Sequence, residues 1–201
     1  PYTTLFRSVF AIKPSGLGYG ELNPDSMVIV DLTGAVVEGK LRPSSDTKTH
    51  LVLYRSFAGI RGVCHSHSPY AVAWAQAGRG IPCLGTTHAD QTAGEIPCTP
   101  MIGPEAVARD YEEGTGELIV ETFSGKKPLE SPMALVAGHG PFTWGKSAMD
   151  AVRNAAALEE IARMALLTYR LDPDAAPLPV HVMRKHFERK HGPGAYYGQP
   201  S

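Results

Sequence analysis

Short apolar runs with the two-residue period of strands alternate along this chain with longer runs that have the period of a helix. Runs typical of strands occupy residues 9–12, 27–31, 35–38, 60–67, 118–123 and 133–136. The second and third of these runs flank a Leu-Thr-Gly segment at residues 32–34, which predicts a hairpin. Helices are predicted to open at residues 42–46, to follow residue 68, and to occupy residues 148–171.

The run at residues 148–171 predicts one long core-packing helix. Val152, Glu159 and Ala162 are expected on its packed side, and Ile161 and further apolar residues extend that stripe. The pattern assigns this helix a structural role and no chemistry.

Two histidines one residue apart, His65 and His67, end the apolar run that begins at residue 60. Residues i and i+2 of a strand point to the same face, so both imidazoles are expected to project together. His139 follows the run at residues 133–136 within glycine-rich sequence. Three neutral imidazoles and a nearby carboxylate would form a metal site that keeps a position open for substrate. The alternative is a set of surface or hydrogen-bonded histidines.

A second candidate site combines hydroxyl groups with a cation. Ser44, Ser45 and Asp46 stand where a helix is predicted to begin, and N-capping is the structural explanation for such residues. The functional alternative is that hydroxyls and free helix amides hold a phosphate group, with Lys13 and Ser15 as further donors. No Walker or Rossmann glycine pattern accompanies them.

Two polar segments further along the chain have two interpretations each. His88 and Asp90 are again one residue apart, which is typical of a polar loop and less often of catalysis. Residues 181–199 are basic and aromatic, and they predict either a disordered tail or an arm that reaches an anionic site on a neighbouring subunit.

Composition narrows the class of protein. The chain has 201 residues of which 43% are hydrophobic, enough for one globular domain with a full core. A net charge of −1 argues against a nucleic-acid or polybasic membrane-binding surface, and no apolar run approaches the length of a membrane span. Cys64, Cys83 and Cys98 lack paired spacing, so free thiols and a cytoplasmic location are expected. Residues 1–8 are predicted to be a non-native leader, and residues 9–201 a single domain.

Taken together, the motifs resemble those of the class II aldolase family and of its epimerase branch in particular. The matching segments are residues 13–16, 43–47, 65–68, 85–90, 139–146, 189–192 and 196–199. The likeness runs from about residue 9 to residue 199. The chain departs from the family at its beginning, because an N-terminal helix and a Gly-Asn loop of the phosphate site have no counterpart.

The resemblance implies a fold and a set of site residues. The fold is an α/β three-layer α/β/α sandwich around a mostly antiparallel sheet, assembled as a cyclic homotetramer with active sites between subunits. The implied metal ligands, for Zn2+ or another divalent ion such as Mn2+, are Asp46, His65, His67 and His139. The implied phosphate-binding residues are Lys13, Ser15, Gly16, Ser44 and Ser45. The implied acid–base pair is Asp90 and Tyr197, with Tyr197 from a neighbouring chain, and His186 and Glu112 are supporting groups.

The implied activity is interconversion of two phosphorylated ketopentoses, L-ribulose 5-phosphate and D-xylulose 5-phosphate, by cleavage and re-formation of the C3–C4 bond. An aldolase that releases a free aldehyde is the nearest alternative. A non-catalytic assembly domain of the adducin type is a second alternative, although such a domain would be expected to lack the metal ligands that stand in this sequence. The resemblance does not distinguish arabinose from ascorbate catabolism.

Overall fold

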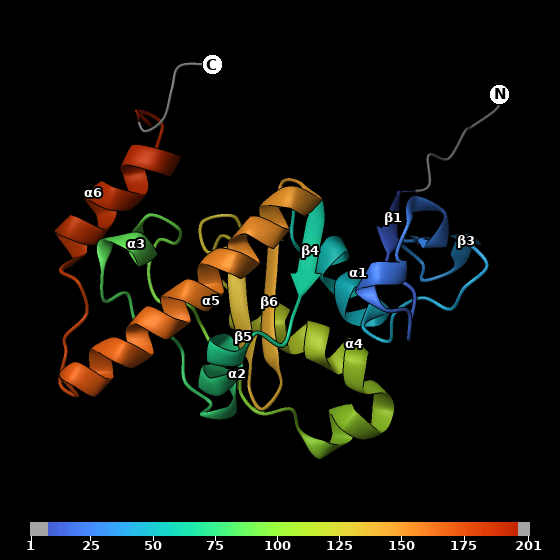
Figure 1. Ribbon diagram of the computed structural model, residues 1–201, viewed down its shortest axis with the longest axis horizontal. Helices are drawn as coiled ribbons and strands as arrows, with labels where there is room; N and C mark the ends of the chain where they lie inside the picture. Colours follow the sequence, from blue (N-terminus) through green and yellow to red (C-terminus); the bar gives the residue numbers. More distant parts are fainter. Residues whose placement is uncertain (1–7, 197–201) are drawn as a thin grey trace. The chain divides into compact units, whose positions relative to one another are not determined.

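The structure is a computed structural model that describes residues 8–196, and these form two compact units. The first unit contains residues up to Phe57 and residues Gly103–Val120, and the second contains Ala58–Ile102 and the residues from Glu121 onward. Each unit has a three-stranded antiparallel sheet of its own (Figure 1). The prediction of an antiparallel α/β protein is therefore confirmed, and the three-layer arrangement stays a prediction.

The first unit is built on the strands β1 (Val9–Ile12), β2 (Val28–Asp31) and β3 (Val36–Glu38), in that spatial order. Short 3-10 turns at Tyr19–Glu21 and Pro24–Ser26 connect β1 to β2. The helix α1 (Thr47–Ser56) follows the sheet, and its Leu51 joins a small core of residues from β1 and β2. The strand and hairpin predictions for this part of the chain are confirmed.

One predicted strand is wrong, because residues 118–123 belong mostly to the helix α4 (Pro104–Thr122). The backbone is non-helical at Asp110 and helical on both sides of it. A Cβ at Gly116 would clash with Val52 of α1, so the two helices approach closely at this glycine. The apolar segment around Ile119 has a high strand propensity, but packing of the whole helix overrides such a preference.

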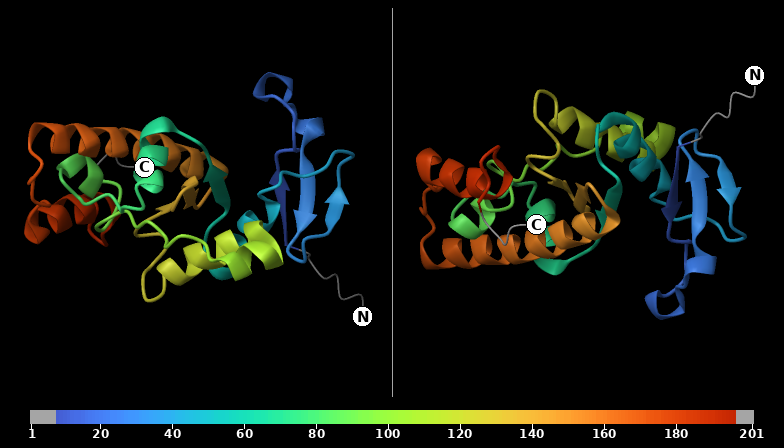
Figure 2. Two further views of the ribbon diagram at one scale, coloured as in Figure 1. Left: turned by 90° about the horizontal axis from the view of Figure 1, so that it is seen from below. Right: turned by 90° about the horizontal axis from the view of Figure 1, so that it is seen from above.

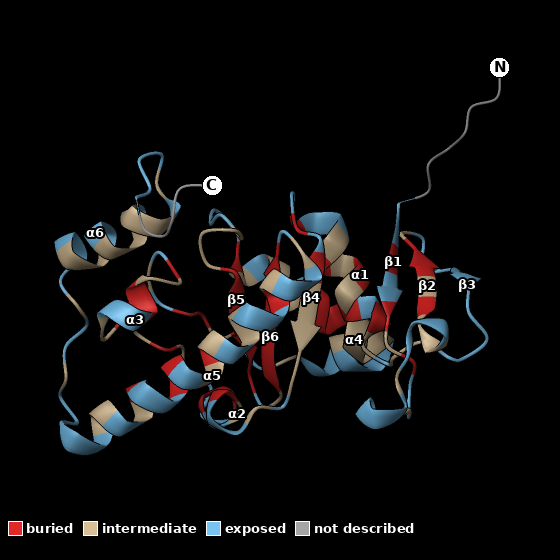
Figure 3. Cartoon of the chain, turned by 45° about the horizontal axis from the view of Figure 1, so that its top comes forward, coloured by how far each residue is buried: buried red, intermediate tan, exposed pale blue. Residues whose placement is uncertain are grey.

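The second unit is built on β4 (Gly62–His65), β6 (Gly140–Gly145) and β5 (Met133–Val136), with β6 in the centre. The sequence pattern did not predict β6, because glycine and Pro141 are unusual in a central strand. Both β5 and β6 are fully buried (Figure 3). Pro141 lacks an N–H group, and its carbonyl oxygen accepts a hydrogen bond from a histidine of β4.

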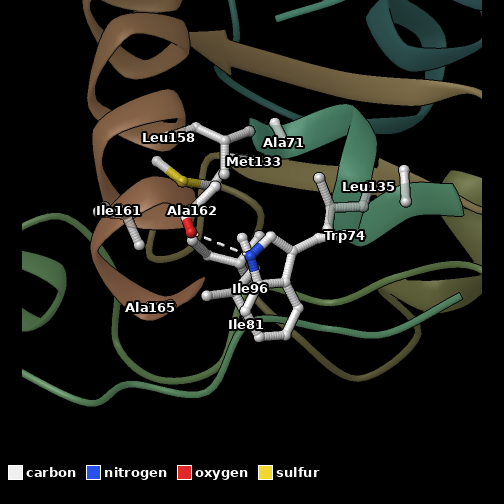
Figure 4. Close-up of a cluster of buried hydrophobic side chains, with 11 residues drawn as sticks. Ala71, Trp74, Ile81, Ile96, Met133, Leu135, Leu158, Ile161, Ala162 and Ala165 are labelled. Atoms are coloured by element: carbon white, nitrogen blue, oxygen red, sulfur yellow. Dashed lines mark hydrogen bonds between the residues drawn. The ribbon is translucent and has the colours of Figure 1, made fainter. Parts of the chain in front are cut away.

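Two helices pack on this sheet, α5 (Ala148–Leu171) and α2 (Pro69–Gln76). Figure 2 shows α5 running beside β4 and β6. Their shared core contains Trp74, whose Nε1 donates to the carbonyl oxygen of Ala162 at 3.0 Å (Figure 4). The bounds predicted for α5 are confirmed. Val152 is 54% exposed, however, because the packed side is centred on Leu158 and Ala162.

The second unit ends with two helices that contact each other, α3 (Thr86–Ala89) and α6 (Val180–His191). The basic segment after residue 180 is therefore helical as far as His191. No helix within residues 8–196 is long and apolar enough to cross a membrane. The three cysteines are free thiols, and burial raises the pKa of Cys98 to about 11.

Candidate active site

Three histidines converge in the second unit. His65 is the last residue of β4, His67 lies between β4 and α2, and His139 lies in the turn from β5 to β6. One ring nitrogen from each lies within 4.8 Å of the others. The predicted cluster is therefore present, but the strand argument for it was only half right. The strand ends at His65, and the irregular segment that follows brings His67 back to it.

Hydrogen bonding fixes the tautomer of His65. Its Nδ1 lies 2.9 Å from the carbonyl oxygen of Pro141, which can only accept, so Nδ1 carries the proton. The Nε2 lone pair of His65 then points toward Nε2 of His67, at 3.1 Å. The ring of His65 also stacks on Phe142 with centroids 4.2 Å apart. Metal-binding histidines are commonly held in this way by a carbonyl on the second nitrogen.

The chemistry of this donor set fits a divalent metal ion. Three imidazoles that offer nitrogen lone pairs to one point match the ligands of catalytic zinc sites, which keep a further position open. Two Nε2 atoms at 3.1 Å can either share one proton or bind one cation. The class II aldolase family is divalent-metal dependent, and the ion's identity remains a prediction.

Asp46 belongs to the first unit and directly precedes α1. Its side chain makes no hydrogen bond to the amides of that helix, so side-chain capping does not explain its presence. The hydroxyl of Thr47 instead donates to the carbonyl oxygen of Ser44 at 2.5 Å. The carboxylate of Asp46 is half-buried, and its role as a metal ligand stays a prediction.

The predicted phosphate-binding residues come together in the first unit. The Ser44 amide donates to the Lys13 carbonyl oxygen and the Ser15 amide to the Arg42 carbonyl oxygen, both at 2.9 Å. Gly16 has φ +74°, a conformation that L-amino acids with a side chain rarely adopt. These bonds use the amides of Ser15 and Ser44. The Ser44 hydroxyl oxygen accepts from the Asp46 amide at 3.3 Å, and its O–H, like that of Ser15, can still donate to an anion. Phosphate binding itself stays a prediction.

Asp90 follows α3 and is surrounded by basic side chains of α6. Arg189 donates to both carboxylate oxygens at 2.8–3.2 Å, Lys190 lies at 3.2 Å, and Nδ1 of His186 lies at 3.1 Å. The carboxylate is 13% exposed. Burial raises the pKa of Asp90, but the hydrogen bonds from Arg189, His186 and Lys190 outweigh it and leave this pKa below its ordinary value. Asp90 is therefore ionised at neutral pH.

The structure brings Asp90, a member of the predicted acid–base pair, into contact with His186, the predicted supporting group, and it adds two residues to the same cluster. Arg189 and Lys190 were expected as part of a basic, aromatic tail and of a segment that resembles the family, but with no role in the site. Their spacing of three and four residues from His186 places all three on one face of a helix, and this was the available signal.

The other predicted residues divide into three cases. Tyr197 lies outside the described residues. Glu112 is half-buried in α4, and its carbonyl oxygen accepts a hydrogen bond from Thr49 at 2.7 Å. His88 is buried, and its Nε2 lies 2.9 Å from the carbonyl oxygen of Gly94, so it ties a loop together. Of His88 and Asp90, Asp90 is the one whose side chain contacts the basic residues of α6 in the described part of the chain.

Comparison with known proteins identifies relatives along nearly the whole chain. The model of the family described as "Class II Aldolase and Adducin N-terminal domain" matches residues 4–166. Two proteins named L-ribulose-5-phosphate 4-epimerase UlaF, from Salmonella paratyphi A and Salmonella typhi, are each 53% identical over 193 residues, which is 96% of this chain and 85% of theirs.

Among solved structures, an L-fuculose 1-phosphate aldolase matches 90% of this chain and 79% of its own with a TM-score of 0.75. At 22% identity this likeness shows the fold alone. The family model, by contrast, covers most of this chain and both histidine segments. The chain therefore belongs to the family of class II aldolases and adducin N-terminal domains.

Proposed function

We propose that this chain is a metal-dependent isomerase that interconverts L-ribulose 5-phosphate and D-xylulose 5-phosphate. One observation carries the choice of reaction, which is the 53% identity over 96% of the chain to proteins named as L-ribulose-5-phosphate 4-epimerases. The convergent histidines His65, His67 and His139 support the dependence on a metal ion.

The reaction must invert C4, a carbon that is not adjacent to the C2 carbonyl and is therefore not acidic. In the proposed route a base takes the proton of the C4 hydroxyl, the C4 oxygen forms a carbonyl, and the C3–C4 electron pair passes into an enediolate. The products of this cleavage are glycolaldehyde phosphate and the enediolate of dihydroxyacetone. The aldehyde turns, C3 attacks its other face, and the new C4 alkoxide takes up a proton.

The three histidines and Asp46 are the proposed ligands of Zn2+ or, alternatively, Mn2+. When bound, the ion supplies Lewis-acid stabilisation for the negative charge on the C2 and C3 oxygens of the substrate. Zinc is preferred because three imidazoles are its usual ligands in catalytic sites. The proton on Nδ1 of His65 keeps Nε2 available as a ligand.

Two proton-transfer groups are required, because the C4 hydroxyl lies on opposite sides in substrate and product. Asp90 and Tyr197 of a neighbouring chain are proposed for these roles. The ionised state of Asp90 suits it to accept a proton from a hydroxyl. His186, 3.1 Å from this carboxylate, is the supporting group that orients it.

The turn at residues 13–16 and the residues before α1 are proposed to bind the substrate phosphate. Lys13, Gly16 and the hydroxyls of Ser15, Ser44 and Ser45 would anchor the aldehyde fragment through its phosphate while its carbonyl turns. The hydrogen bonds that join the two segments support this placement.

Residues 9–201 are proposed to act as one three-layer domain within a cytoplasmic homotetramer that has its sites at subunit interfaces. The family match at residues 4–166 supports a single domain, because it includes parts of both compact units. The proposed contribution of Tyr197 from a neighbouring chain requires such an assembly.

The test is incubation of the purified protein with L-ribulose 5-phosphate, with and without a chelator, while formation of D-xylulose 5-phosphate is followed. The wild-type protein is expected to convert the sugar only in the presence of metal. His67→Asn is expected to lose activity, and His181→Asn, an exposed histidine of α6, serves as the matched control. Metal-loaded protein without conversion would refute the proposal.

The same assay distinguishes the two alternatives. Accumulation of glycolaldehyde phosphate in place of a second pentulose would indicate a class II aldolase. Absence of bound metal after purification without chelator would favour a non-catalytic adducin-like domain.

A further inference from the structure

We propose that Glu159 is a positioning residue for the histidine cluster, because it fastens the beginning of α2 to α5 and thereby sets the place of His67. The inference rests on the proposed function, since it assumes that the cluster binds a metal ion. Glu159 lies on the packed side of α5 and was expected there only as part of a structural stripe.

The first turn of α2 has two amides that need an acceptor. Pro69 at its first position has no N–H group, and the side chain of Ser68 does not cap the helix. The amide of Tyr70 donates to one carboxylate oxygen of Glu159 at 3.0 Å, and the amide of Ala71 donates to the other at 2.9 Å. A carboxylate at this end of a helix is also favoured by the helix dipole. Glu159 therefore replaces the local cap with an anchor from another helix.

A third hydrogen bond, at a second point along the helix, also fastens α2 to α5. The indole Nε1 of Trp74 donates to the carbonyl oxygen of Ala162 at 3.0 Å (Figure 4). Ala162 lies one turn after Glu159 along α5. With two attachments, one at the first turn of α2 and one further along it, the helix can neither slide nor rotate freely on α5.

His67 depends on this arrangement more than the other histidine of its segment does. His65 is held by the Pro141 carbonyl oxygen and by stacking on Phe142. Within residues 8–196, His67 makes its single hydrogen bond through Nε2 to Nε2 of His65, and its Nδ1 has no partner. The ring is also exposed. Apart from ring contacts with His65 and His139 in the cluster itself, its position is therefore set by the backbone between β4 and Pro69, the residue with which α2 begins.

The helix α5 also holds the strand that follows His139. The hydroxyl of Thr143 in β6 donates to the carbonyl oxygen of Ala151 at 2.8 Å, and the side-chain amide of Asn154 donates to the carbonyl oxygen of Trp144 at 2.8 Å. The same helix thus supports β6 directly and His67 through α2. Of the two attachments of α2 to α5, Glu159 is the one at the end of α2 next to His67.

The test replaces the carboxylate by an amide of the same size. Glu159→Gln retains a single acceptor oxygen and no charge, so one of the two anchoring bonds is lost. We expect Zn2+ affinity, measured by competition with a chromophoric chelator, to weaken by about tenfold, the lower end of the range for outer-sphere residues. The visible absorption of the Co2+-loaded protein is also expected to change, because it reports ligand geometry.

Glu160→Gln is the matched control. Glu160 is the next residue of α5, it is exposed, and it pairs only loosely with Arg163 at 3.6 Å. This variant is expected to keep the wild-type Zn2+ affinity and Co2+ spectrum. A second variant, Glu159→Asp, keeps the charge but shortens the reach, and it is subjected to the same measurements in case Glu159→Gln does not fold.

The outcomes separate positioning from simple stabilisation. If the Glu159 variants unfold more easily as metal-free protein but keep the wild-type affinity and spectrum, Glu159 is only a helix cap and the inference is overturned. If the wild-type protein itself binds neither Zn2+ nor Co2+, the proposed function fails and the inference with it. Weaker binding with an altered spectrum in the Glu159 variants alone supports it.

Discussion

Acidification is expected to destabilise this protein through His88 well before its carboxylates are protonated. His88 is 4% exposed in α3, and its Nε2 lies 2.9 Å from the carbonyl oxygen of Gly94. Burial lowers the pKa of His88 from 6.5 to about 4, against the opposing effect of the Gly94 and Pro82 carbonyl groups. The imidazole of His88 is therefore neutral in the folded protein at neutral pH.

The sign and size of the effect follow from proton linkage. Between pH 6.5 and pH 4 the unfolded chain binds a proton that the folded chain does not, so the free energy of unfolding falls as the pH is lowered. One pKa unit corresponds to about 1.36 kcal/mol, so the whole difference is worth about 3 kcal/mol and is lost below pH 4. Of this, about 1.8 kcal/mol is lost between pH 7 and pH 5.

Urea unfolding of the metal-free protein at pH 7 and pH 5 measures this loss. His88→Gln is the comparison, because its amide can still donate to the Gly94 carbonyl oxygen but does not titrate. The wild-type protein is expected to lose about 1.8 kcal/mol more than the variant over this range. Asp90, whose basic neighbours hold its pKa below the ordinary value, is present in both proteins, so its titration cancels in the comparison. Equal losses in the two proteins would refute the reasoning.

Two further predictions concern packing and charge. Asp90→Asn removes the negative charge that binds the basic side chains of α6. We expect the free energy of unfolding to fall by about 2 kcal/mol and the amides of α6 to exchange hydrogen faster. Asp110→Asn is the control: it weakens the ion pair with Lys48, whose side chain is 56% exposed, and it should change stability little because water and salt screen that pair and the Asn side-chain oxygen can still accept from the Glu113 amide. Gly62→Ala would drive a Cβ into the Ser147 carbonyl oxygen at the start of α5, so its melting temperature should fall sharply, whereas Gly103→Ala has open space and should melt like the wild type.

The elements whose hydrophobic pattern is local and unambiguous could be predicted from the sequence. The strands at residues 9–12 and 133–136, the hairpin around residues 32–34, and the helix at residues 148–171 all agree with their predicted positions. The three histidines were also identifiable as a possible metal site from their residue type and their place after apolar runs. In each case the signal lies within a few residues of chain, where strand and helix periods and turn chemistry operate.

Features that depend on contacts between residues far apart in the sequence could be seen only in the folded structure. The apolar segment 118–123 became helix through packing, and the glycine- and proline-bearing segment 140–145 became a central strand by pairing with β4 and β5. Asp90 meets Arg189, 99 residues away, and Glu159 meets the amide of Tyr70, 89 residues away. The local sequence cannot specify these contacts, because a carboxylate has the same pattern whether it faces water, a helix end or a cluster of cations. Its role is set by which element the fold places opposite it.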